Sequence, residues 1–158
     1  MNDQEGLAIA IEEAKTSYKE GGVPIGAALV SRDGKLLGRG HNMRVQSGSA
    51  IHHGETSALY NSGRLPASAY KGATMFTTLS PCDMCTGACI LYGIGRVVIG
   101  ENKTFLGGEA YLKQRGVEVA VLENKECQDL MELFIKEKPE IWNEDIGEEE
   151  RVYSKEAK

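Results

Sequence analysis

The sequence has few of the features that mark secreted, membrane-spanning or nucleic-acid-binding proteins. Its first residues, 1–5, lack the basic and apolar regions of a signal peptide, and no apolar run approaches the ~20 residues that span a bilayer. Positive charge is also scarce, because 18 Lys and Arg stand against 23 Asp and Glu, for a net charge of −5. A nucleic-acid-binding domain carries a basic surface. We therefore expect a protein of the cytoplasm, or of cytoplasm and nucleus, that binds neither membranes nor nucleic acid.

Cysteine is sparse as well, with four residues in the chain. Four cysteines in a secreted protein would suggest two disulfides, but the absence of a secretion signal favours a reducing compartment. At 158 residues, of which 41% are hydrophobic, the chain is long enough for one domain with a substantial core. We expect that domain to span residues 1–148, followed by a charged, frayed tail at 149–158.

Hydrophobic periodicity predicts helices interspersed among about five strands. The expected helices are residues 4–19, 56–61, 82–92, 109–114 and 125–138, with a further element after Pro139. The expected strands are residues 23–31, 35–41, 73–79, 96–100 and 117–122. Such a chain predicts an α/β fold with a mixed five-stranded sheet that helices cover on both faces.

One segment, residues 79–85, places Cys82 and Cys85 on one face of the first turn of a predicted helix. Ser80 is the expected N-cap of that helix, and Pro81 fits its first position, where no N–H is needed. The positive helix end favours thiolates, and two thiolates can share a zinc ion at about 2.3 Å. Taken alone, the cysteine pair is equally typical of a redox dithiol, of half a structural zinc site and of two buried cysteines.

A second motif, His53-Gly54-Glu55, stands at the start of another predicted helix and supplies a third ligand. Because no fourth strong ligand stands beside these three, the site should be open to water, as in catalytic zinc sites. Residues two apart on a helix point about 200° apart, so His53 is the expected ligand and Glu55 the proton shuttle. Together, H-x-E and P-C-x-x-C form the signature of the zinc nucleobase deaminases. A structural zinc beside a solvated Glu55 is the alternative.

The remaining cysteines and histidines are not expected to bind the metal. Cys89 follows Cys82 by seven residues, which is about 10 Å along a helix and too far for a shared tetrahedral ion. We therefore expect a buried free thiol at Cys89. Cys127 has no ligand nearby in the sequence, His52 does not fit the H-x-E spacing, and His41 is expected to pack at a strand end.

His53-Gly54-Glu55 and residues 80–88 together resemble the cytidine deaminase superfamily, and within it the cytosine deaminases of fungi. Gly54 favours cytosine as substrate, since relatives that act on nucleosides, guanine or tRNA adenosine typically carry Ala there; Asp83 and Thr86 favour it too. The likeness covers roughly residues 12–148 and includes 21–26, 38–44, 100–102 and 144–148. It implies a three-layer α/β/α sandwich, one zinc ion per chain and a homodimer.

The resemblance also implies the reaction, the hydrolytic deamination of cytosine to uracil and ammonia in pyrimidine salvage. Zinc would be held by His53, Cys82 and Cys85, and Glu55 would move the protons. The implied substrate contacts are Asn42, the Gly54 N–H, the Ser80 carbonyl, Phe105, Trp142 and Asp145.

Taken alone, some of these residues have other interpretations. Phe105 lies in a glycine-rich loop, where it could cover a substrate or belong to the core. The same two interpretations apply to Trp142. Asp145 could equally be a surface charge. The alternative functions are a tRNA adenosine or guanine deaminase with the same chemistry, and a non-catalytic zinc-binding subunit. An intact Glu55 argues against the subunit.

Overall fold

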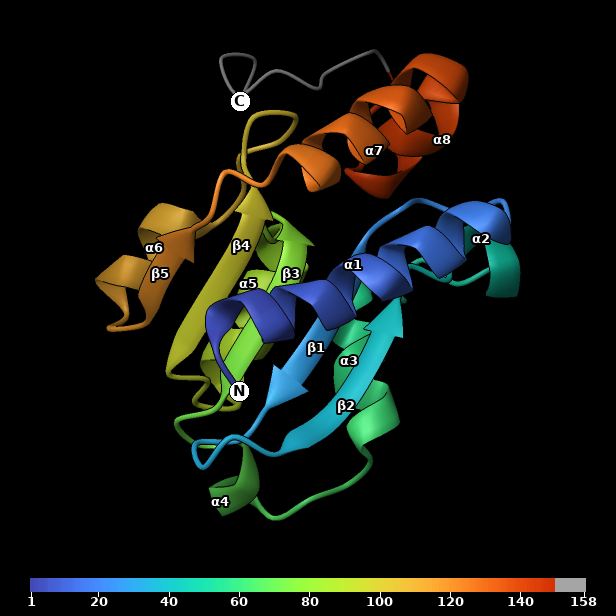
Figure 1. Cartoon of the computed structure of the whole chain (residues 1–158). Coiled ribbons are helices and arrows are strands. Elements are labelled where there is room, and N and C mark those ends of the chain that lie inside the picture. Colours follow the sequence, from blue (N-terminus) through green and yellow to red (C-terminus); the bar gives the residue numbers. More distant parts are fainter. Residues whose placement is uncertain (150–158) are drawn as a thin grey trace.

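The computed structural model describes residues 1–149, which form a mixed five-stranded sheet with helices on both faces (Figure 1). The strand order is β2-β1-β3-β4-β5. β1 pairs antiparallel with β2 and β3, whereas β3–β4 and β4–β5 are parallel pairs. The strands are β1 (Gly26–Val30), β2 (Leu36–His41), β3 (Thr74–Leu79), β4 (Arg96–Glu101) and β5 (Glu118–Val121). The predicted fold class and mixed sheet are confirmed.

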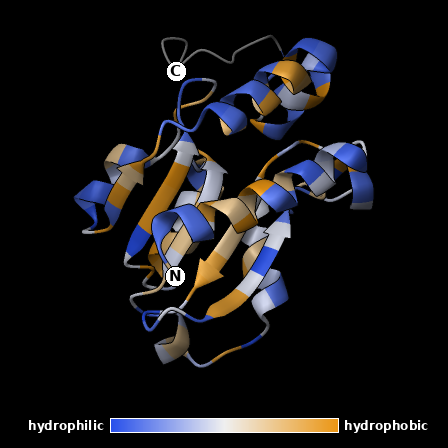
Figure 2. Cartoon of the chain, in the orientation of Figure 1, coloured by the Kyte–Doolittle hydropathy of each residue, from blue (hydrophilic) through white to orange (hydrophobic). Residues whose placement is uncertain are grey.

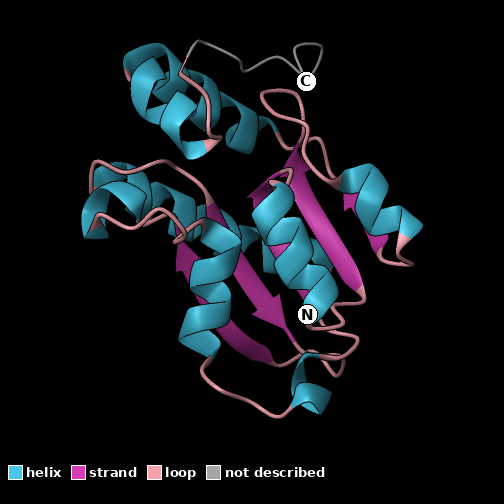
Figure 3. Cartoon of the chain, turned by 180° about the vertical axis from the view of Figure 1, so that it is seen from behind, coloured by secondary structure: helices cyan, strands magenta, loops and turns pink. Residues whose placement is uncertain are grey.

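Helices form a layer on each side of the sheet, as opposite views of the chain show (Figures 1 and 3). The face toward the viewer in Figure 1 carries α1 (Asp3–Lys19) and the start of α7 (Lys125–Glu137). The other face carries α3 (Gly54–Ser62), α5 (Asp83–Leu91) and α6 (Glu109–Gln114). The short helices are α2 (Arg44–Ser47), α4 (Ala67–Tyr70) and α8 (Pro139–Asp145).

Two of these short helices were not expected from the sequence. α2 lies in the segment between β2 and α3, and α4 lies in the connection between α3 and β3. Each is four residues long, about one turn, so neither can show a hydrophobic repeat. Gly48 ends α2 with a left-handed φ of 67°, the conformation that favours glycine at a helix end.

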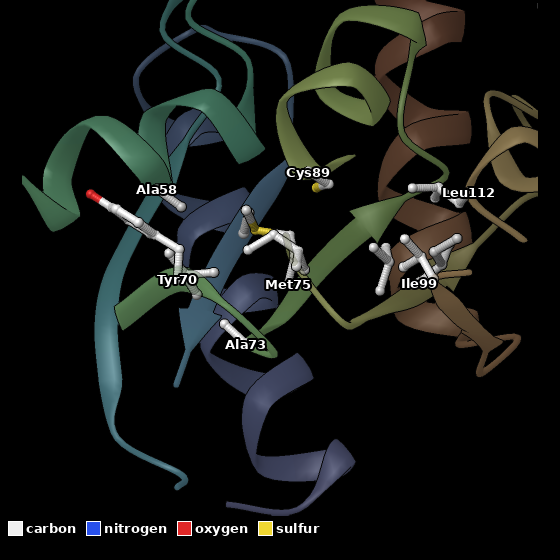
Figure 4. Close-up of a cluster of buried hydrophobic side chains, with 12 residues drawn as sticks. Ala58, Tyr70, Ala73, Met75, Cys89, Ile99 and Leu112 are labelled. Atoms are coloured by element: carbon white, nitrogen blue, oxygen red, sulfur yellow. The ribbon is translucent and has the colours of Figure 1, made fainter. Parts of the chain in front are cut away.

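Residues that alternate along the strands divide the core between the two faces of the sheet. On one face Met75 and Ile99 pack with Cys89 of α5 and Leu112 of α6 (Figure 4). On the other, Phe76 packs beneath α1, and a Cβ on Gly6 would lie 2.4 Å from the Phe76 ring, so only glycine permits this approach. Figure 2 shows the mainly hydrophobic β1 and β4 and the mixed hydropathy of helices such as α7.

The carboxyl ends of β2, β3 and β4 meet at the edge of the sheet where β1 begins, at the top of Figure 1. This follows from the strand directions, since β1 runs opposite to both of its neighbours. Asn42, Ser80 and the segment 102–108 therefore leave the sheet on the same side. Ligands of open α/β sheets bind outside the carboxyl ends of the strands, so this edge is where a site is expected.

Within residues 1–149, no helix combines the length and the apolar character that a membrane crossing requires. The predicted tail at 149–158 lies outside the described residues except for Glu149.

Candidate metal centre

The N-termini of two helices bring the candidate ligands together. His53 is the N-cap of α3, and Cys82 is the N-cap of α5, with Cys85 in the first turn. The His53 N–H donates to Thr56 Oγ1 at 2.9 Å, which ties the start of α3. The prediction that Ser80 caps α5 is wrong, because Cys82 occupies that position. Ser80 Oγ instead donates to another part of the chain, Glu109 Oε2, at 2.7 Å.

The three ligand atoms have the spacing of a zinc site. His53 Nδ1 lies 3.4 Å from Cys82 Sγ and 3.8 Å from Cys85 Sγ. Tetrahedral zinc with ordinary bond lengths would separate a nitrogen and a sulfur ligand by roughly 3.6 Å. Among residues 1–149 these three form the one such cluster, and all of its ligand atoms lie within 4.8 Å of one another. The residues present therefore fit a zinc ion held by three protein ligands.

The cysteines and histidines that were set aside do not belong to this cluster. Cys89 is fully buried and free, in agreement with the helix-rise argument, and Cys127 is free as well. His41 lies between the carboxylates of Glu13 and Glu20, at 2.7 Å and 2.9 Å. These residues have structural surroundings that need no metal.

Burial and close neighbours shift the pKa values of the ligands in opposite directions. Burial lowers the pKa of His53, but the hydrogen bond with Cys82 and the charge of Asp145 outweigh it and raise that pKa to about 9. The hydrogen bond with Cys85 lowers the pKa of Cys82 to about 4, against the effect of burial. The same bond raises the pKa of Cys85. Metal binding needs these groups deprotonated and therefore releases protons.

Glu55, in the first turn of α3, is buried beside the ligands with 3% of its surface exposed. Burial, together with the charge of Cys82, raises its pKa to about 7 against the opposing charge of His53. Glu55 lines a small cavity with His53 and Cys82. A carboxyl group that titrates near neutral pH can both accept and return a proton. The arrangement therefore combines a metal site with an acid–base group.

The structure brings four of the six predicted substrate contacts to this cavity: Ser80, Phe105, Trp142 and Asp145. Asn42 is linked to them, because its Nδ2 donates to Asp145 Oδ1 at 2.7 Å. The same Asp145 oxygen lies 3.5 Å from His53 Nε2, on the side of the imidazole away from the thiols. Asp145 is 6% exposed, so its interpretation as a surface charge is excluded.

Gly54, the sixth predicted contact, is absent from the cavity lining but sits between His53 and Glu55. A Cβ at this position would lie 3.2 Å from Ile25 Cγ2, tighter than ordinary contact. Glycine thus lets the start of α3 pack closely against the residue that precedes β1.

Two aromatic side chains close the cavity from different elements. Phe105, from the segment between β4 and α6, and Trp142, from α8, meet edge to face with ring centroids 5.9 Å apart. Both side chains are buried, at 5% and 0% exposed. Both also belong to the core cluster beneath α7 and α8. Phe105 and Trp142 therefore belong to the core and also line the cavity.

The apolar part of the wall, which was not predicted from the sequence, consists of Ile25, Leu79 and Ile146. Each borders a feature that was recognised: Ile25 precedes β1, Leu79 ends β3 and Ile146 follows α8. Their position next to these predicted elements was the feature of the sequence that could have identified them. Outside the small cavity, a wider one of about 460 Å³ opens to a rim that includes Arg44 and Glu144.

Comparisons with known proteins agree with this geometry. Residues 1–101 match the family described as the cytidine and deoxycytidylate deaminase zinc-binding region. The chain is 60% identical over 148 residues to the cytosine deaminase of Candida albicans, covering 94% of this chain and 99% of that protein. It is 38% identical over 111 residues to a tRNA-specific adenosine deaminase of Streptococcus pyogenes, covering 66% of each. A solved chain from a study of A-to-I editing by tRNA:A34 deaminases aligns with a TM-score of 0.69 at 25% identity, covering 80% of this chain and 99% of that one.

Proposed function

The chain belongs to the cytidine and deoxycytidylate deaminase family, and on that premise we propose that it hydrolyses free cytosine to uracil and ammonia. The observation that carries the proposal is the cavity, where metal ligands, the buried Glu55 and the Asp145 carboxylate converge between two aromatic walls. The 60% identity with the cytosine deaminase of Candida albicans over nearly its whole length supports cytosine as the substrate.

In this proposal His53, Cys82 and Cys85 hold zinc and Glu55 moves the protons. When bound, zinc supplies hydroxide at neutral pH by lowering the pKa of a water molecule toward about 7. Glu55 would take the proton of the attacking water and deliver it to ring N3 as the water oxygen adds to C4. Glu55 would then take the proton of the new C4 hydroxyl group and deliver it to the departing ammonia, which leaves the carbonyl of uracil.

The other residues orient the ring. Asp145 accepts the N1–H of the free base. Asn42 donates one Nδ2 hydrogen to Asp145, and its Oδ1 accepts from the Arg44 N–H at 3.0 Å, so the amide is fixed with one hydrogen left for the ring carbonyl. The Gly54 N–H shares that carbonyl, and the Ser80 carbonyl faces the amine. Phe105 and Trp142 cover the ring.

A tRNA adenosine deaminase is the second candidate, because a relative of that name is 38% identical to this chain. Two observations favour the free base. The net charge is −5, and in the proposed pose the buried Asp145 carboxylate lies beside N1, the ring atom that carries the sugar in a pyrimidine nucleotide. A non-catalytic zinc subunit is disfavoured because Glu55 lies against the ligands in the same cavity.

Ammonia release from cytosine, cytidine, guanine and adenosine, measured with zinc-loaded protein, tests the proposal. We expect turnover of cytosine, and turnover at least about 100-fold slower by a Glu55→Ala control that still holds zinc. Turnover of guanine or adenosine without turnover of cytosine would move the protein to another branch of the family.

We also propose that a second copy of the chain covers an apolar groove over α3 and α5. The groove has a volume of about 760 Å³ and an apolar lining that includes Ile51, Tyr60 and Tyr92, which are 60%, 73% and 43% exposed. Monomers rarely expose large continuous apolar patches, and homodimer interfaces are the more apolar ones. The homodimer that the family resemblance implies fits this surface. The four free cysteines fit a reducing compartment, and we place the protein in the cytoplasm.

Mass measurement by light scattering tests the dimer. Tyr60→Lys should yield monomers, because the lysine charge would be buried unpaired in the interface. Leu133→Lys, at a 43% exposed position on α7 outside the groove, is the matched control and should remain dimeric. A wild-type mass of one chain at micromolar concentration would refute the proposal.

A further inference from the structure

The segment 102–108, here called the aromatic loop, carries Phe105 to the cavity and is held by two buried glutamates, Glu101 before it and Glu109 after it. At its start, Glu101 Oε2 accepts from the backbone N–H groups of Lys103 and Thr104, at 2.7 Å and 3.0 Å. The Thr104 hydroxyl donates to the other Glu101 oxygen. Glu101 is 1% exposed and ends β4, so this tie fixes the loop to the sheet.

The second tie joins the far end of the loop to the strand that precedes the Cys82 helix. The Gly107 N–H donates to Ser80 Oγ at 2.9 Å, and Ser80 Oγ donates to Glu109 Oε2 at 2.7 Å. The other Glu109 oxygen accepts from Asn102 Nδ2 at 3.3 Å. Glu109 is 7% exposed, and Ser80 is 3% exposed. One buried carboxylate thereby connects both ends of the loop to the residue between β3 and α5.

Beside a backbone bond from the Gly108 N–H to the Pro81 carbonyl at 2.9 Å, the side-chain bonds at the far end of the loop all lead to Glu109. A serine hydroxyl has one proton, and Ser80 already accepts the Gly107 N–H, so its own proton goes to Glu109. An ionised carboxylate only accepts, and hydrogen bonds to it are stronger than those between neutral groups. In a buried chain of this kind the bonds strengthen one another. Loss of the carboxylate therefore frees the Ser80 proton and the Asn102 amide together.

We propose that Glu109 is a positioning residue for substrate binding: through Ser80 and Asn102 it holds the aromatic loop closed against Trp142. Glu109 lines neither the small cavity nor the wider one, so it acts on the substrate only through these neighbours. The edge-to-face contact of Phe105 with Trp142 is the feature that the tie maintains. The kinetic part of this inference rests on the proposed cytosine deaminase activity, whereas the structural part does not.

The kinetic signature follows from where the loop acts. The Phe105 wall contacts the ring in the ground state and in the transition state alike, and removing such uniform binding raises KM while kcat changes little. A merely structural role would reduce the amount of folded enzyme, which lowers the apparent kcat and leaves KM unchanged. The ratio of the two effects therefore separates positioning from folding.

Trp142 provides a signal that needs no substrate, because it is the single tryptophan of the chain and is 0% exposed. Acrylamide should quench its fluorescence poorly in the wild type. In Glu109→Ala the released loop should expose Trp142, so quenching should increase. KM for cytosine should rise about tenfold, corresponding to about 1.4 kcal/mol, with kcat within about threefold of the wild type.

Three further variants make the test specific. Glu109→Gln should restore both readouts, since its oxygen still accepts from Ser80 and the Asn102 amide can turn to accept from its NH₂. Ser80→Ala keeps the backbone carbonyl but breaks the tie, so it should resemble Glu109→Ala and add little to it in the double variant. Glu126→Ala removes another first-turn glutamate, on α7, and should behave as wild type.

Two results would overturn the proposal: unchanged quenching of Trp142 in both Glu109→Ala and Ser80→Ala, or a fall in kcat at constant KM. If Glu109→Ala does not fold, Ser80→Ala decides alone. If the wild type does not turn over cytosine, the proposed function fails, and the quenching comparison still decides whether Glu109 positions the loop.

Discussion

Exchanging the free base for its nucleoside tests the substrate assignment most directly. Free cytosine carries a proton on N1, whereas cytidine carries ribose there and has no N–H to donate. The proposed acceptor, Asp145, is buried and already receives the Asn42 amide at 2.7 Å. A nucleoside in the same pose would remove the N1–H bond and leave a buried carboxylate short of a partner.

The size of the effect can be worked out from that bond. A hydrogen bond to a charged group contributes about 1.5–3 kcal/mol, or roughly 10- to 150-fold in kcat/KM. Sites built around a hydrogen bond reject analogues that lack it by about 10⁴-fold, because their own buried group stays unpaired. Ribose would also displace part of the wall formed by Trp142 and Ile146. We therefore expect kcat/KM for cytosine to exceed that for cytidine by about 10²- to 10⁴-fold.

The assay measures initial rates of ammonia release with each substrate, for the wild type and for Asp145→Asn. The asparagine oxygen can still accept from Asn42, but its NH₂ would then face the N1–H as a second donor. The variant should lose about 100-fold on cytosine and little on cytidine, which never made that bond. Comparable wild-type rates on both substrates, or equal losses on both in the variant, would refute the role of Asp145.

Three further predictions concern the metal site and the fold. Glu55→Ala should retain one zinc per chain, measured by elemental analysis, and lose about 10²-fold or more in kcat; loss of stoichiometric zinc would show that Glu55 is a ligand. Cys89→Ala should keep zinc and lose about 1–2 kcal/mol in urea unfolding, because the fully buried thiol only fills the core beneath α5; a metal-free variant would contradict the geometry. Asp3 accepts a hydrogen bond from Arg96 at 2.8 Å, which lowers its pKa below 3.8, so it stabilises the fold above that pH and ceases to do so as the pH falls through the lowered pKa. The wild type should thus be more stable than Asp3→Asn at neutral pH, and urea titrations should show the difference vanishing in acid; a difference that persists in strong acid would exclude this cause.

The fold could be predicted well because its signals are local. Strands β1 to β5 and helices α1, α6 and α7 follow from hydrophobic periodicity and from glycines at their ends. The helices α2 and α4 could not be predicted this way, since one turn contains no repeat. The order and direction of the strands could not be predicted from local patterns either, because they depend on which strands pair when the chain folds.

The features of the site also divide into those with local sequence signals and those that depend on distant residues. His53, Cys82 and Cys85 were predictable since ligand spacing and helix starts lie within a few residues of one another. The sequence does not show that His53 presents Nδ1 to the thiols and Nε2 to Asp145, because that depends on a residue 92 positions away on α8. The misassigned cap has the same origin: Ser80 looks like an N-cap locally, yet its hydroxyl bonds to Glu109, 29 residues further along.

In the proposed function, the zinc chemistry and part of the substrate selectivity come from different parts of the chain. The family match at residues 1–101 contains all three ligands and Glu55, whereas Phe105, Trp142 and Asp145 follow it. A zinc centre with an adjacent glutamate can deaminate any amidine that reaches it, so the choice of base belongs to what surrounds the centre. In the proposed function, the part of those surroundings that lies outside the family match is the aromatic loop and α8, which pack together in one core cluster. Exchange of these two segments alone should therefore change which base is accepted while zinc binding persists, because none of the ligands lies within them.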